Sequence, residues 1–353
     1  MTKITFCMPS VQLLPSGGYK VVYEYANRLA LEGNSVNILY PATVGFHRSS
    51  IRNKLKAIIY YVYFVFKPFK IGWFKFEHNV NNIFVWSLDE KYIPSFSDII
   101  IATGASTAYP VSLNEKVKKK YYFIQGYETW SINEADLIKT YKLPLKKIVI
   151  ADYLLEKVEE AGEKAKLVYN GFDFDYFRMY NSPSERNKYQ IVMPYNKARL
   201  KGCDVGFKAL ELVHKKYPEV RVLLYGVHRP KKMPPFCTFY LRPEKKVFNQ
   251  IYNTSAIFLG PSFTEGFCLT VSEAMQCGCA VVCTNIGGYT VVCKNRKTAL
   301  VGEVGDPQSL ADLIVELIED DSLRYSIANS GHNMIEDFTW EKAFTSFKKA
   351  IEL

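Results

Sequence analysis

Short apolar runs alternate with amphipathic stretches along almost the whole chain. Runs of this kind, bounded by turn residues, are typical of buried parallel strands, and the stretches between them have the spacing of helices. The pattern therefore predicts an α/β fold of doubly wound parallel sheets. Strands are expected at 3–9, 35–41, 83–88, 98–103, 120–125, 147–151 and 166–169, and then at 190–194, 220–226, 238–241, 256–260 and 280–284.

A polar and irregular stretch interrupts this alternation near the middle of the chain. It begins around residues 169–173 and continues to Asn187, after which strands and helices resume. A chain of 353 residues is also longer than a usual single domain. We therefore predict two Rossmann-like domains, residues 1–169 and residues 170–338, whose ligands bind at the carboxyl ends of the strands.

The cysteines and the N-terminus indicate a reducing compartment. The eight cysteines include no Cys-x-x-Cys pair with matched histidines, so neither a zinc site nor a disulfide framework is expected. The strand pattern at 3–9 lacks the apolar core and the small-residue cleavage site of a signal peptide. The protein is therefore expected to stay in the cytoplasm.

The formal net charge of +10 suits nucleic acid, anionic lipid or phosphorylated small molecules as partners. The basic residues form small groups at 116–120, 229–232 and 245–246, without the spacing of a zinc finger, an RNA-recognition motif or a helix-turn-helix. We therefore expect no nucleic-acid partner, and steeply salt-dependent DNA binding would contradict this.

Two glutamates stand eight positions apart in the stretch EGFCLTVSEAMQCGCAVVCTNIGG of residues 265–288. A predicted strand precedes Glu265, and a helix is expected to begin after Gly266, which places Glu273 about one turn inside it. Carboxylates in this position would repel a bare phosphate. They are suited instead to accept hydrogen bonds from sugar and ribose hydroxyls.

The start of the same helix is a second candidate for ligand binding. Free backbone N–H groups around Phe267, Cys268 and Leu269 would lie at its positive end, with Thr270 on the same stripe as Glu273. Such a helix terminus binds an anionic or hydroxyl-rich ligand without a dedicated cationic side chain. The alternative is that both glutamates are ordinary surface residues near a helix start.

The stretch resembles the signature of family 4 glycosyltransferases of the GT-B fold, E-G-F-G-L-P-x-x-E-A-M-A-x-G-x-P-V-V followed by Gly-Gly. The departures of the chain from this signature include Cys268, Thr270 and Ala280, and the first two of these are expected to alter contacts to the donor sugar. It agrees with the signature at Glu265, Gly266, Phe267, Leu269, Glu273, Ala274, Met275, Gly278, Val281, Val282, Gly287 and Gly288.

The resemblance implies a GT-B enzyme with an interdomain cleft, a nucleotide-sugar donor and retention of the anomeric configuration. It implies that Glu273 holds the ribose hydroxyls, that Glu265 holds a hydroxyl of the donor sugar, and that the amides of 267–269 hold the sugar or a phosphate. It also implies that the last helix, 339–353, packs back on the N-terminal domain. Thr339 is the expected N-cap of that helix.

Glycine-containing turns follow the first strand of each half. Gly17 and Gly18 match the Gly-Gly loop of the family, where the backbone closely approaches the donor phosphates or the acceptor. An ordinary pair of loop glycines is the alternative.

The turn of the second half, residues 195–202, carries three cations. Family members place an arginine and a Lys-Gly here to neutralise the donor diphosphate. Lys201 corresponds to the lysine, and either Lys197 or Arg199 takes the place of the arginine. Without the resemblance these residues would be interpreted as solvated loop cations.

No metal ion or other cofactor is expected. Residues 173–175 have the Asp-x-Asp form that holds a divalent cation in the other large glycosyltransferase fold. They end a segment that resembles the Pro-Asn-Gly-Val-Asp hinge of the GT-B family, so we interpret them as part of a hinge.

Two strand ends of the N-terminal half are candidates for acceptor binding. Where many family members carry a histidine near the donor sugar, this chain has FIQGYETW at 123–130, which resembles a subgroup that includes rhamnosyltransferases of bacterial surface glycans. The candidates are Gln125, Tyr127 and Glu128 here, and Gly104 and Ser106 after the strand 98–103. Ordinary polar turns are the alternative.

The segment 54–76, KLKAIIYYVYFVFKPFKIGWFKF, is apolar and aromatic at 57–66 and contains five lysines. The apolar run is too short to span a bilayer. Its composition is typical of a segment that lies on anionic lipid, and the alternative is a buried helix whose lysines reach solvent. We favour the first, which would place the protein peripherally on the inner face of the cell membrane.

The sequence therefore predicts a retaining hexosyltransferase that acts in bacterial surface polysaccharide synthesis. The expected donor is dTDP-rhamnose or a UDP-hexose, and the expected acceptor is a glycan, lipid-linked in the favoured interpretation. The alternative is a catalytically inactive nucleotide-sugar-binding GT-B protein that acts as a scaffold at the membrane. Glu265, Glu273 and Lys201 are all present, which disfavours this alternative.

Overall fold

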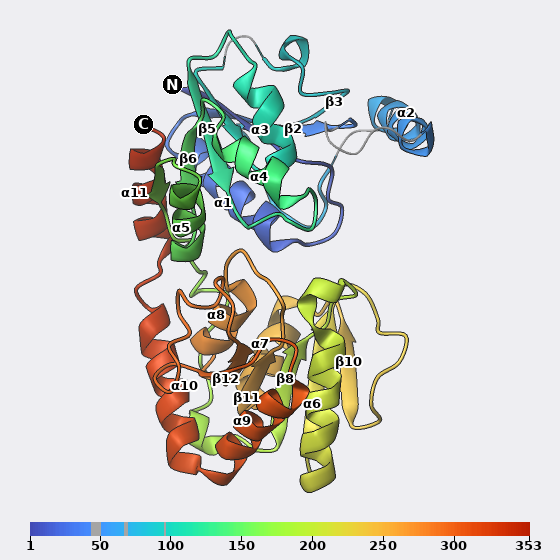
Figure 1. Cartoon of the computed structure of the whole chain (residues 1–353), viewed down its shortest axis with the longest axis vertical. Coiled ribbons are helices and arrows are strands. Elements are labelled where there is room, and N and C mark those ends of the chain that lie inside the picture. Colours follow the sequence, from blue (N-terminus) through green and yellow to red (C-terminus); the bar gives the residue numbers. More distant parts are fainter. Residues whose placement is uncertain (44–50, 67–69, 95–96) are drawn as a thin grey trace. The chain divides into compact units, whose positions relative to one another are not determined.

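The computed structural model describes residues 1–43, 51–66, 70–94 and 97–353. The chain divides into two compact units: unit 1 is Met1–Tyr169 with Phe344–Leu353, and unit 2 is Asn170–Ala343. Each unit is built on one parallel sheet covered by helices (Figure 1). The predicted α/β fold with two doubly wound sheets is confirmed.

Unit 1 contains a seven-stranded sheet in the order β3-β2-β1-β4-β5-β6-β7. The order reverses between β1 and β4, and in open parallel sheets ligands bind at the carboxyl ends of the strands near such a reversal. The strands are β1 (Lys3–Cys7), β2 (Ser35–Pro41), β3 (Val80–Val85), β4 (Ile99–Ala102), β5 (Lys119–Ile124), β6 (Lys146–Val149) and β7 (Ala165–Leu167). The helices are α1 (Gly17–Leu31), α2 (Ile51–Phe66), α3 (Ala105–Ser112), α4 (Glu134–Tyr141) and α5 (Asp152–Glu160), with the short 3-10 helix η1 (Glu90–Tyr92).

The end of the chain belongs to the core of unit 1. Helix α11 (Trp340–Ala350) is capped at its start by the Thr339 hydroxyl, which accepts a hydrogen bond from the amide of Lys342 at 3.3 Å. Phe347 is fully buried, and its ring stacks on that of Tyr25 with the centroids 4.1 Å apart. Stacked aromatic pairs of this kind contribute more to stability than the burial of their surface area alone.

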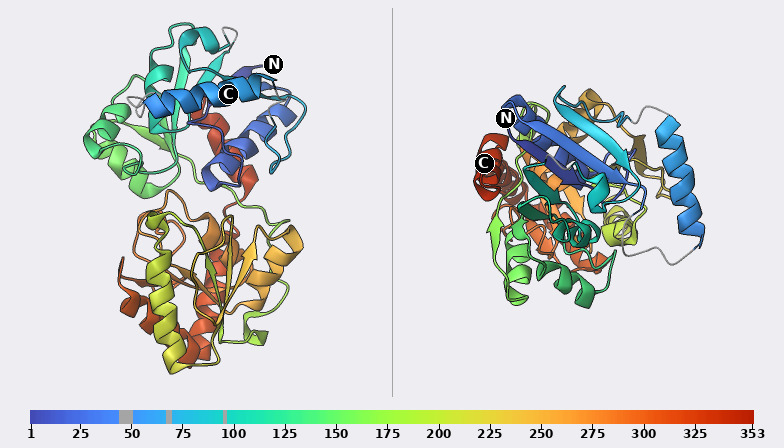
Figure 2. Two further views of the ribbon diagram at one scale, coloured as in Figure 1. Left: turned by 90° about the vertical axis from the view of Figure 1, so that its right-hand side faces the viewer. Right: turned by 90° about the horizontal axis from the view of Figure 1, so that it is seen from above.

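Helix α2 lies on the outside of unit 1, beside the edge strand β3 (Figures 1 and 2). Tyr61 and Phe64 face the strand: the ring centroid of Phe64 is 4.8 Å from that of Phe84, and that of Tyr61 is 5.2 Å from that of Trp86. Within the described residues, no helix has the length and apolar character needed to cross a membrane.

The second part of the predicted interfacial segment packs elsewhere. Trp73 donates a hydrogen bond from Nε1 to the backbone oxygen of Gln12 at 3.0 Å, and Tyr23 on α1 contacts the rings of Trp73, Phe74 and Phe76. The structure thus divides the segment 54–76 into a helix and a stretch packed on α1, and its residues 67–69 lie outside the described part of the chain.

Unit 2 contains a six-stranded sheet in the order β10-β9-β8-β11-β12-β13. The edge strand β13 was not predicted, because its three residues give too short a pattern. The strands are β8 (Gln190–Pro194), β9 (Arg221–Gly226), β10 (Cys237–Leu241), β11 (Ile257–Gly260), β12 (Ala280–Thr284) and β13 (Leu300–Gly302). The helices are α6 (Cys203–Lys216), α7 (Lys245–Thr254), α8 (Leu269–Gln276), α9 (Pro307–Glu319) and α10 (Asp321–Ile335), with the 3-10 helices η2 (Pro183–Glu185) and η3 (Arg199–Lys201).

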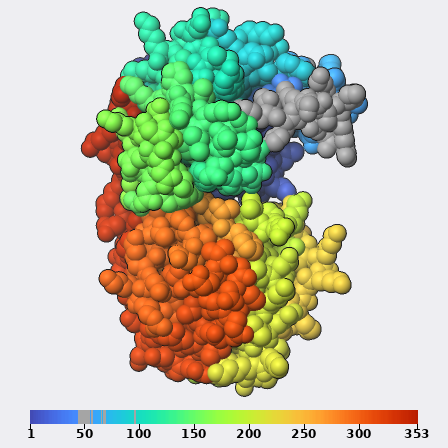
Figure 3. All heavy atoms as spheres, in the orientation of Figure 1, coloured from blue at the N-terminus to red at the C-terminus, as the bar shows by residue number. Residues whose placement is uncertain are grey.

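One loop of unit 2 stands out from the body of the sheet. Residues 227–236 connect β9 to β10 and carry the basic group 229–232 (Figures 1 and 3). The central strands β11 and β12 are fully buried.

Candidate functional site

The order of strands in unit 2 brings three loops together. Strands β8, β11 and β12 are direct neighbours and run parallel, so the segments that follow them leave the sheet at the same edge. These segments are 195–202, 261–268 and 285–289. They carry all the donor-site residues predicted in the second half except Leu269, Thr270 and Glu273, which lie on α8.

The first two loops touch at Gly202. Its φ of +60° is in the left-handed region, and a Cβ at this position would lie 1.9 Å from the backbone oxygen of Pro261. The amide of Phe263 also donates to the backbone oxygen of Leu200 at 2.8 Å. Only glycine permits this approach, which fixes Lys201 beside the segment that carries Glu265.

Glu265 is held by a lysine and a serine. Lys201 Nζ lies 2.6 Å from Glu265 Oε2, and Ser262 Oγ donates to Oε1 at 2.8 Å. A Cβ at Gly288 would lie 2.4 Å from the backbone oxygen of Glu265, so glycine is needed there as well. The buried Tyr289 hydroxyl hydrogen-bonds Ser262 from behind.

The ion pair of Glu265 and Lys201 is only partly buried. The side chain of Glu265 is 15% exposed and that of Lys201 is 36% exposed, so a ligand can reach both. The lysine ammonium has three donors, of which Glu265 uses one. Lys201 is therefore fixed in place and keeps hydrogen-bonding capacity for an anion.

Glu273 lies in the second turn of α8 and is also supported by buried tyrosines. The hydroxyl of Tyr252 donates to Glu273 Oε2 at 3.3 Å, and the hydroxyls of Tyr225 and Tyr252 lie 2.5 Å apart. Burial raises the pKa of both tyrosines well above the ordinary value, so both hydroxyls stay protonated. Each candidate glutamate thus ends a short chain of hydroxyl groups.

At the start of α8 the structure differs from expectation only at Cys268, whose side chain was expected to alter contacts to the donor sugar. Cys268, the N-cap residue, is 1% exposed, and its Sγ lies 3.4 Å from the Ser272 hydroxyl. Burial raises the pKa of this thiol to about 12. Phe267 is also buried and stacks on Phe172 at 5.8 Å. The side chains of Phe267 and Cys268 therefore belong to the interior, and only their backbone can contact a ligand.

The remaining predicted donor-site residues of unit 2 are more accessible. Lys197 and Arg199 are exposed, and the side chain of neither has a hydrogen bond or ion pair with any residue that the structure describes. Gly266, which directly follows Glu265, is half-buried. Thr270, three residues before Glu273 on α8, is also half-buried. Either cation can therefore extend toward a diphosphate.

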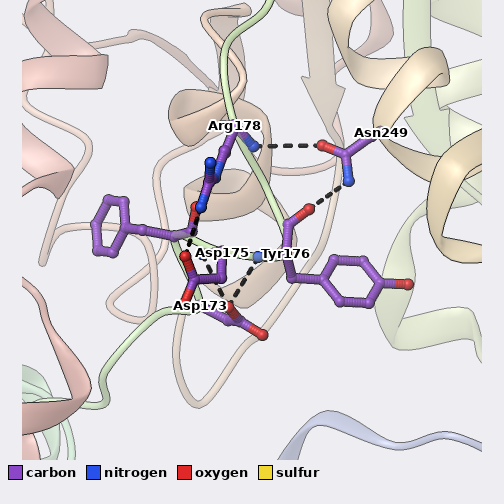
Figure 4. A network of polar contacts seen from close by, with 6 residues as sticks. Asp173, Asp175, Tyr176, Arg178 and Asn249 are labelled. Carbon is purple, nitrogen blue, oxygen red and sulfur yellow. Dashed lines mark hydrogen bonds and ion pairs between the residues drawn. The ribbon is translucent and has the colours of Figure 1, made fainter.

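The Asp-x-Asp segment forms a structural turn (Figure 4). Asp173 Oδ1 accepts hydrogen bonds from the amides of Asp175 at 3.0 Å and Tyr176 at 2.8 Å, and Asp175 pairs with Arg178 at 2.5 Å. Asn249 on α7 binds the backbone of Tyr176 and Arg178. In the described part of the chain, no three His, Cys, Asp or Glu side chains converge as a metal site would require.

A second set of candidates meets at the carboxyl ends of β1, β4 and β5 in unit 1. Glu128 Oε1 accepts a hydrogen bond from the amide of Ala105, the first residue of α3, at 3.1 Å. The same carboxylate lies against Gly104, and the side chain of Gln125 lies against Gly18. The structure thus brings together Gly18, Gly104, Gln125 and Glu128, and Gly17 precedes them as the first residue of α1.

Two groups in this set have unusual environments. Burial raises the pKa of the Glu128 carboxyl to about 7, against the opposing effects of the Ala105 amide and the Ser131 side chain. Oε1 of Gln125 is buried, and no described residue donates a hydrogen bond to it. A carboxyl that is partly protonated near neutral pH and an unsatisfied amide oxygen are both suited to bind hydroxyl groups.

Tyr127 is not part of this set. Its hydroxyl donates to Glu134 on α4 at 2.5 Å, and Lys157 lies over its ring at 5.7 Å. Its side chain is therefore engaged with α4 and α5. Ser106 is half-buried in the first turn of α3, where the Thr107 hydroxyl caps the helix instead.

Comparison with known proteins identifies similarity to glycosyltransferases in the second half of the chain. Residues 180–334 match the family model described as glycosyl transferases group 1. D-inositol 3-phosphate glycosyltransferase of Corynebacterium urealyticum is 29% identical over 172 residues, which are 44% of this chain and 40% of that protein. O-antigen chain mannosyltransferase B of Escherichia coli is 33% identical over 103 residues, 29% of this chain and 26% of that protein. The chain therefore spans less than half the length of these relatives.

The fold of the whole chain is similar to that of solved glycosyltransferase structures. The structure of HepE from Anabaena in complex with UDP and glucose superposes with a TM-score of 0.74 and 14% identity, covering 100% of both chains. The two doubly wound sheets are those of the GT-B glycosyltransferases. Within this fold, residues 180–334 are the part that matches the glycosyl transferases group 1 family.

Sequence reasoning missed the residues that support the two glutamates. Ser262, Tyr252, Tyr225 and Tyr289 lie on different loops, strands and helices, and no local spacing connects them. The pairing of Lys201 with Glu265, 64 residues apart, was also not predicted. Tyr289 had one signal, since it directly follows the glycine pair that the resemblance identifies.

Proposed function

We propose that the protein is a retaining glycosyltransferase of family 4 that transfers a sugar from a nucleotide-sugar donor to a glycan. The observation that carries this proposal is the cluster of Lys201, Glu265 and Glu273 at the loops after β8 and β11, within the segment that matches glycosyl transferases group 1. HepE, which has the same fold, binds UDP, glucose and UDP-glucose.

The two glutamates would bind hydroxyl groups of the donor. Glu273 accepts from the ribose hydroxyls while Tyr252 donates one hydrogen bond to its Oε2, and Glu265 accepts from a hydroxyl of the sugar. Because Lys201 and Ser262 hold both oxygens of Glu265, this carboxylate meets the sugar in one orientation. Such fixed acceptors supply orientation, which lowers the entropic part of the barrier.

Positive groups would stabilise the leaving diphosphate. Lys201, one of Lys197 and Arg199, and the first amides of α8 face charge that grows on the phosphate as the bond from the anomeric carbon breaks. The acceptor oxygen then forms its bond to that carbon on the face that the diphosphate leaves, and its proton passes to a diphosphate oxygen. No side chain forms a covalent bond with the sugar in this scheme.

The acceptor would bind to unit 1 at Gln125 and Glu128. The unsatisfied amide oxygen of Gln125 and the carboxyl of Glu128 offer an acceptor and a group that can donate or accept near neutral pH. The relatives named as an O-antigen mannosyltransferase and a capsular polysaccharide glycosyltransferase favour a bacterial surface glycan. We propose a lipid-linked glycan as the acceptor, with dTDP-rhamnose or a UDP-hexose as the donor.

A thermal-shift panel tests the donor site. The protein is heated with dTDP-, UDP- and GDP-sugars, and the donor is expected to raise Tm because it binds only the folded state. Glu273→Ala should abolish the shift without lowering Tm in the absence of ligand by more than a few degrees. Glu244→Ala, an exposed glutamate at the N-cap of α7, is the control and should respond like the wild type.

Transfer itself is then measured with the donor that the panel identifies. Product NMR should show the anomeric configuration of the donor, and Glu273→Ala should lower kcat/KM by at least about a hundredfold, or about 3 kcal/mol. An inverted product would contradict the retaining mechanism. A donor-dependent shift with no transfer to any glycan would favour the second candidate, an inactive nucleotide-sugar-binding scaffold.

A further inference from the structure

The outward face of α2 is a continuous apolar stripe. Leu55, Ile58, Ile59, Val62, Tyr63 and Phe66 recur at the spacing of one helical face. All are exposed, from 47% at Ile58 through 67% at Ile59 to 82% at Phe66. Single exposed apolar residues are normal on proteins, but a contiguous patch of this kind marks an interaction surface.

The fold of unit 1 uses only the opposite face of this helix. Tyr61 and Phe64 lie against Phe84 on β3 and against Trp86, and both are half-buried. A helix that was part of the core would also cover its second face. The structure therefore contradicts the alternative in which the run 57–66 is a buried helix with lysines that reach solvent.

The stretch of sequence that contains α2 carries charge of one sign. Residues 33–76 contain no Asp or Glu, and they contain the seven basic residues Arg48, Arg52, Lys54, Lys56, Lys67, Lys70 and Lys75. A second copy of the chain on this face would bring two such basic segments together, which Coulomb repulsion disfavours. An anionic surface is complementary to them.

We propose that the outer face of α2 docks the protein on an anionic lipid bilayer, with the helix in the plane of the interface. A helix of this length extends about 24 Å, which is shorter than the hydrocarbon core of a bilayer. Apolar side chains inserted at the level of the headgroups, together with basic residues beside them, are what interfacial helices use to bind.

The proposed membrane contact is confined to α2. Trp73, Phe74 and Phe76 are half-buried against Tyr23, so substitutions there would disturb packing on α1. Membrane binding can be measured independently of the proposed glycosyl transfer, because binding to vesicles requires neither donor nor acceptor.

Vesicle co-sedimentation tests the proposal. The full chain is mixed with vesicles of phosphatidylcholine, with and without phosphatidylglycerol, in the absence of substrates. The wild type should bind the anionic vesicles, and the double variant Ile59→Ser with Phe66→Ser should bind at least about tenfold more weakly, because two inserted apolar side chains are lost. Leu31→Ser is the matched control: Leu31 is 68% exposed on α1 of the same unit, and this variant should bind like the wild type.

The other outcomes are distinct. Equal binding by the double variant and the wild type, or no binding by the wild type, would overturn the proposal. A concentration-dependent dimer in sedimentation velocity that Ile59→Ser with Phe66→Ser abolishes, without vesicle binding, would assign this face to a second copy. Both variants should keep the donor-induced thermal shift, so a failure here is separable from a failure of the proposed glycosyl transfer.

Discussion

At the scale of single residues, the carboxyl of Glu128 is where structure and pH are most directly linked. Its neighbours with ionisable side chains are Tyr19, Tyr122 and Tyr141, whose pKa values are raised, so they stay neutral across the range in which Glu128 titrates. The pKa of the carboxyl is therefore governed mainly by burial. The Ala105 amide is the fixed hydrogen-bond donor to this group.

The stability that Glu128 contributes should fall as the pH rises. Its pKa is about 7 in the folded protein and near 4.5 in the unfolded chain, so between these values the folded state holds more protons and loses stability with increasing pH. Glu128→Gln keeps the acceptor for Ala105 and does not ionise. Its free energy of unfolding relative to the wild type should rise from pH 5 to pH 8 by up to about 3 kcal/mol.

Urea unfolding of both proteins at a series of pH values measures this difference. Groups that titrate in both proteins cancel, so the difference reports on position 128 alone. A difference that does not change with pH would show that the carboxyl is solvated in the folded state.

The side chain of Gln276 places a polar amide in the interior of unit 2. It is 1% exposed in α8, and neither its Oε1 nor its Nε2 has a hydrogen-bond partner among the described residues. A buried amide without partners costs free energy that an apolar side chain of similar shape avoids. Gln276→Met should therefore stabilise the protein by about 1 to 2 kcal/mol.

Thermal unfolding followed by circular dichroism checks this expectation. Gln250→Met on α7 is the control, because that side chain is exposed and the substitution should leave Tm unchanged. A lower Tm for Gln276→Met would indicate that a ligand or water satisfies the amide in solution.

The residues of the site were predictable to different degrees. Glu265 and Glu273 were identified because their stretch of sequence, in which a strand, a turn and a helix follow one another, resembles a family signature. Lys201 was found from its own turn, but its pairing with Glu265 depends on the order of strands in the sheet, which the sequence does not state. Tyr252 lies on α7, and only the tertiary fold places its hydroxyl behind Glu273.

At the scale of elements, the contact between the β8 and β11 loops depends on the absence of a side chain at Gly202. A methyl group there would meet the Pro261 oxygen at 1.9 Å, in addition to the strain of a left-handed backbone. Gly202→Ala should therefore separate Lys201 from Glu265 and destabilise unit 2 by more than about 3 kcal/mol.

Gly33→Ala is the matched control for this prediction. Gly33 also has a left-handed φ, +85°, but no atom lies within 4 Å of the position of a Cβ. This variant should cost only the backbone strain, about 1 kcal/mol. Hydrogen exchange by mass spectrometry should show lost protection at β8 and β11 in the first variant alone, and equal effects of the two would contradict a role for the clash.

The strands were predictable because burial on both faces makes them continuous apolar runs. Strands β2, β8 and β12 begin and end at the predicted residues, whereas β3 lies three residues earlier than predicted, since its polar Asn81 and Asn82 hide the start of the run. Helix α2 shows the opposite case. Its composition is apolar nearly all round, and only the structure distinguishes the face on β3 from the exposed one.

At the scale of the whole molecule, the chain begins and ends in the same unit. Phe347 of α11 lies among Phe6 on β1, Tyr25 on α1 and Phe123 on β5, with centroid distances of 6.4, 4.1 and 5.5 Å. The hydroxyl of Tyr121 also donates to the backbone oxygen of Ile351 at 2.8 Å. The last ten residues, Phe344–Leu353, thus fill a position in the core of unit 1 that Met1–Tyr169 leave open.

This arrangement predicts that a defect at the C-terminus unfolds unit 1, although most of that unit lies far from the C-terminus in sequence. Phe347→Ala removes a fully buried ring and should destabilise unit 1 by about 3 to 5 kcal/mol. Hydrogen exchange should then lose protection in peptides from β1 and β5, although they precede the substitution by more than two hundred residues. Peptides from β8, β11 and β12 should keep theirs, because the ring contacts of Phe347 lie in unit 1.

Lys349→Ala, an exposed position on the same helix, should change neither set. Equal loss of protection in unit 2 would show that the two units unfold as one.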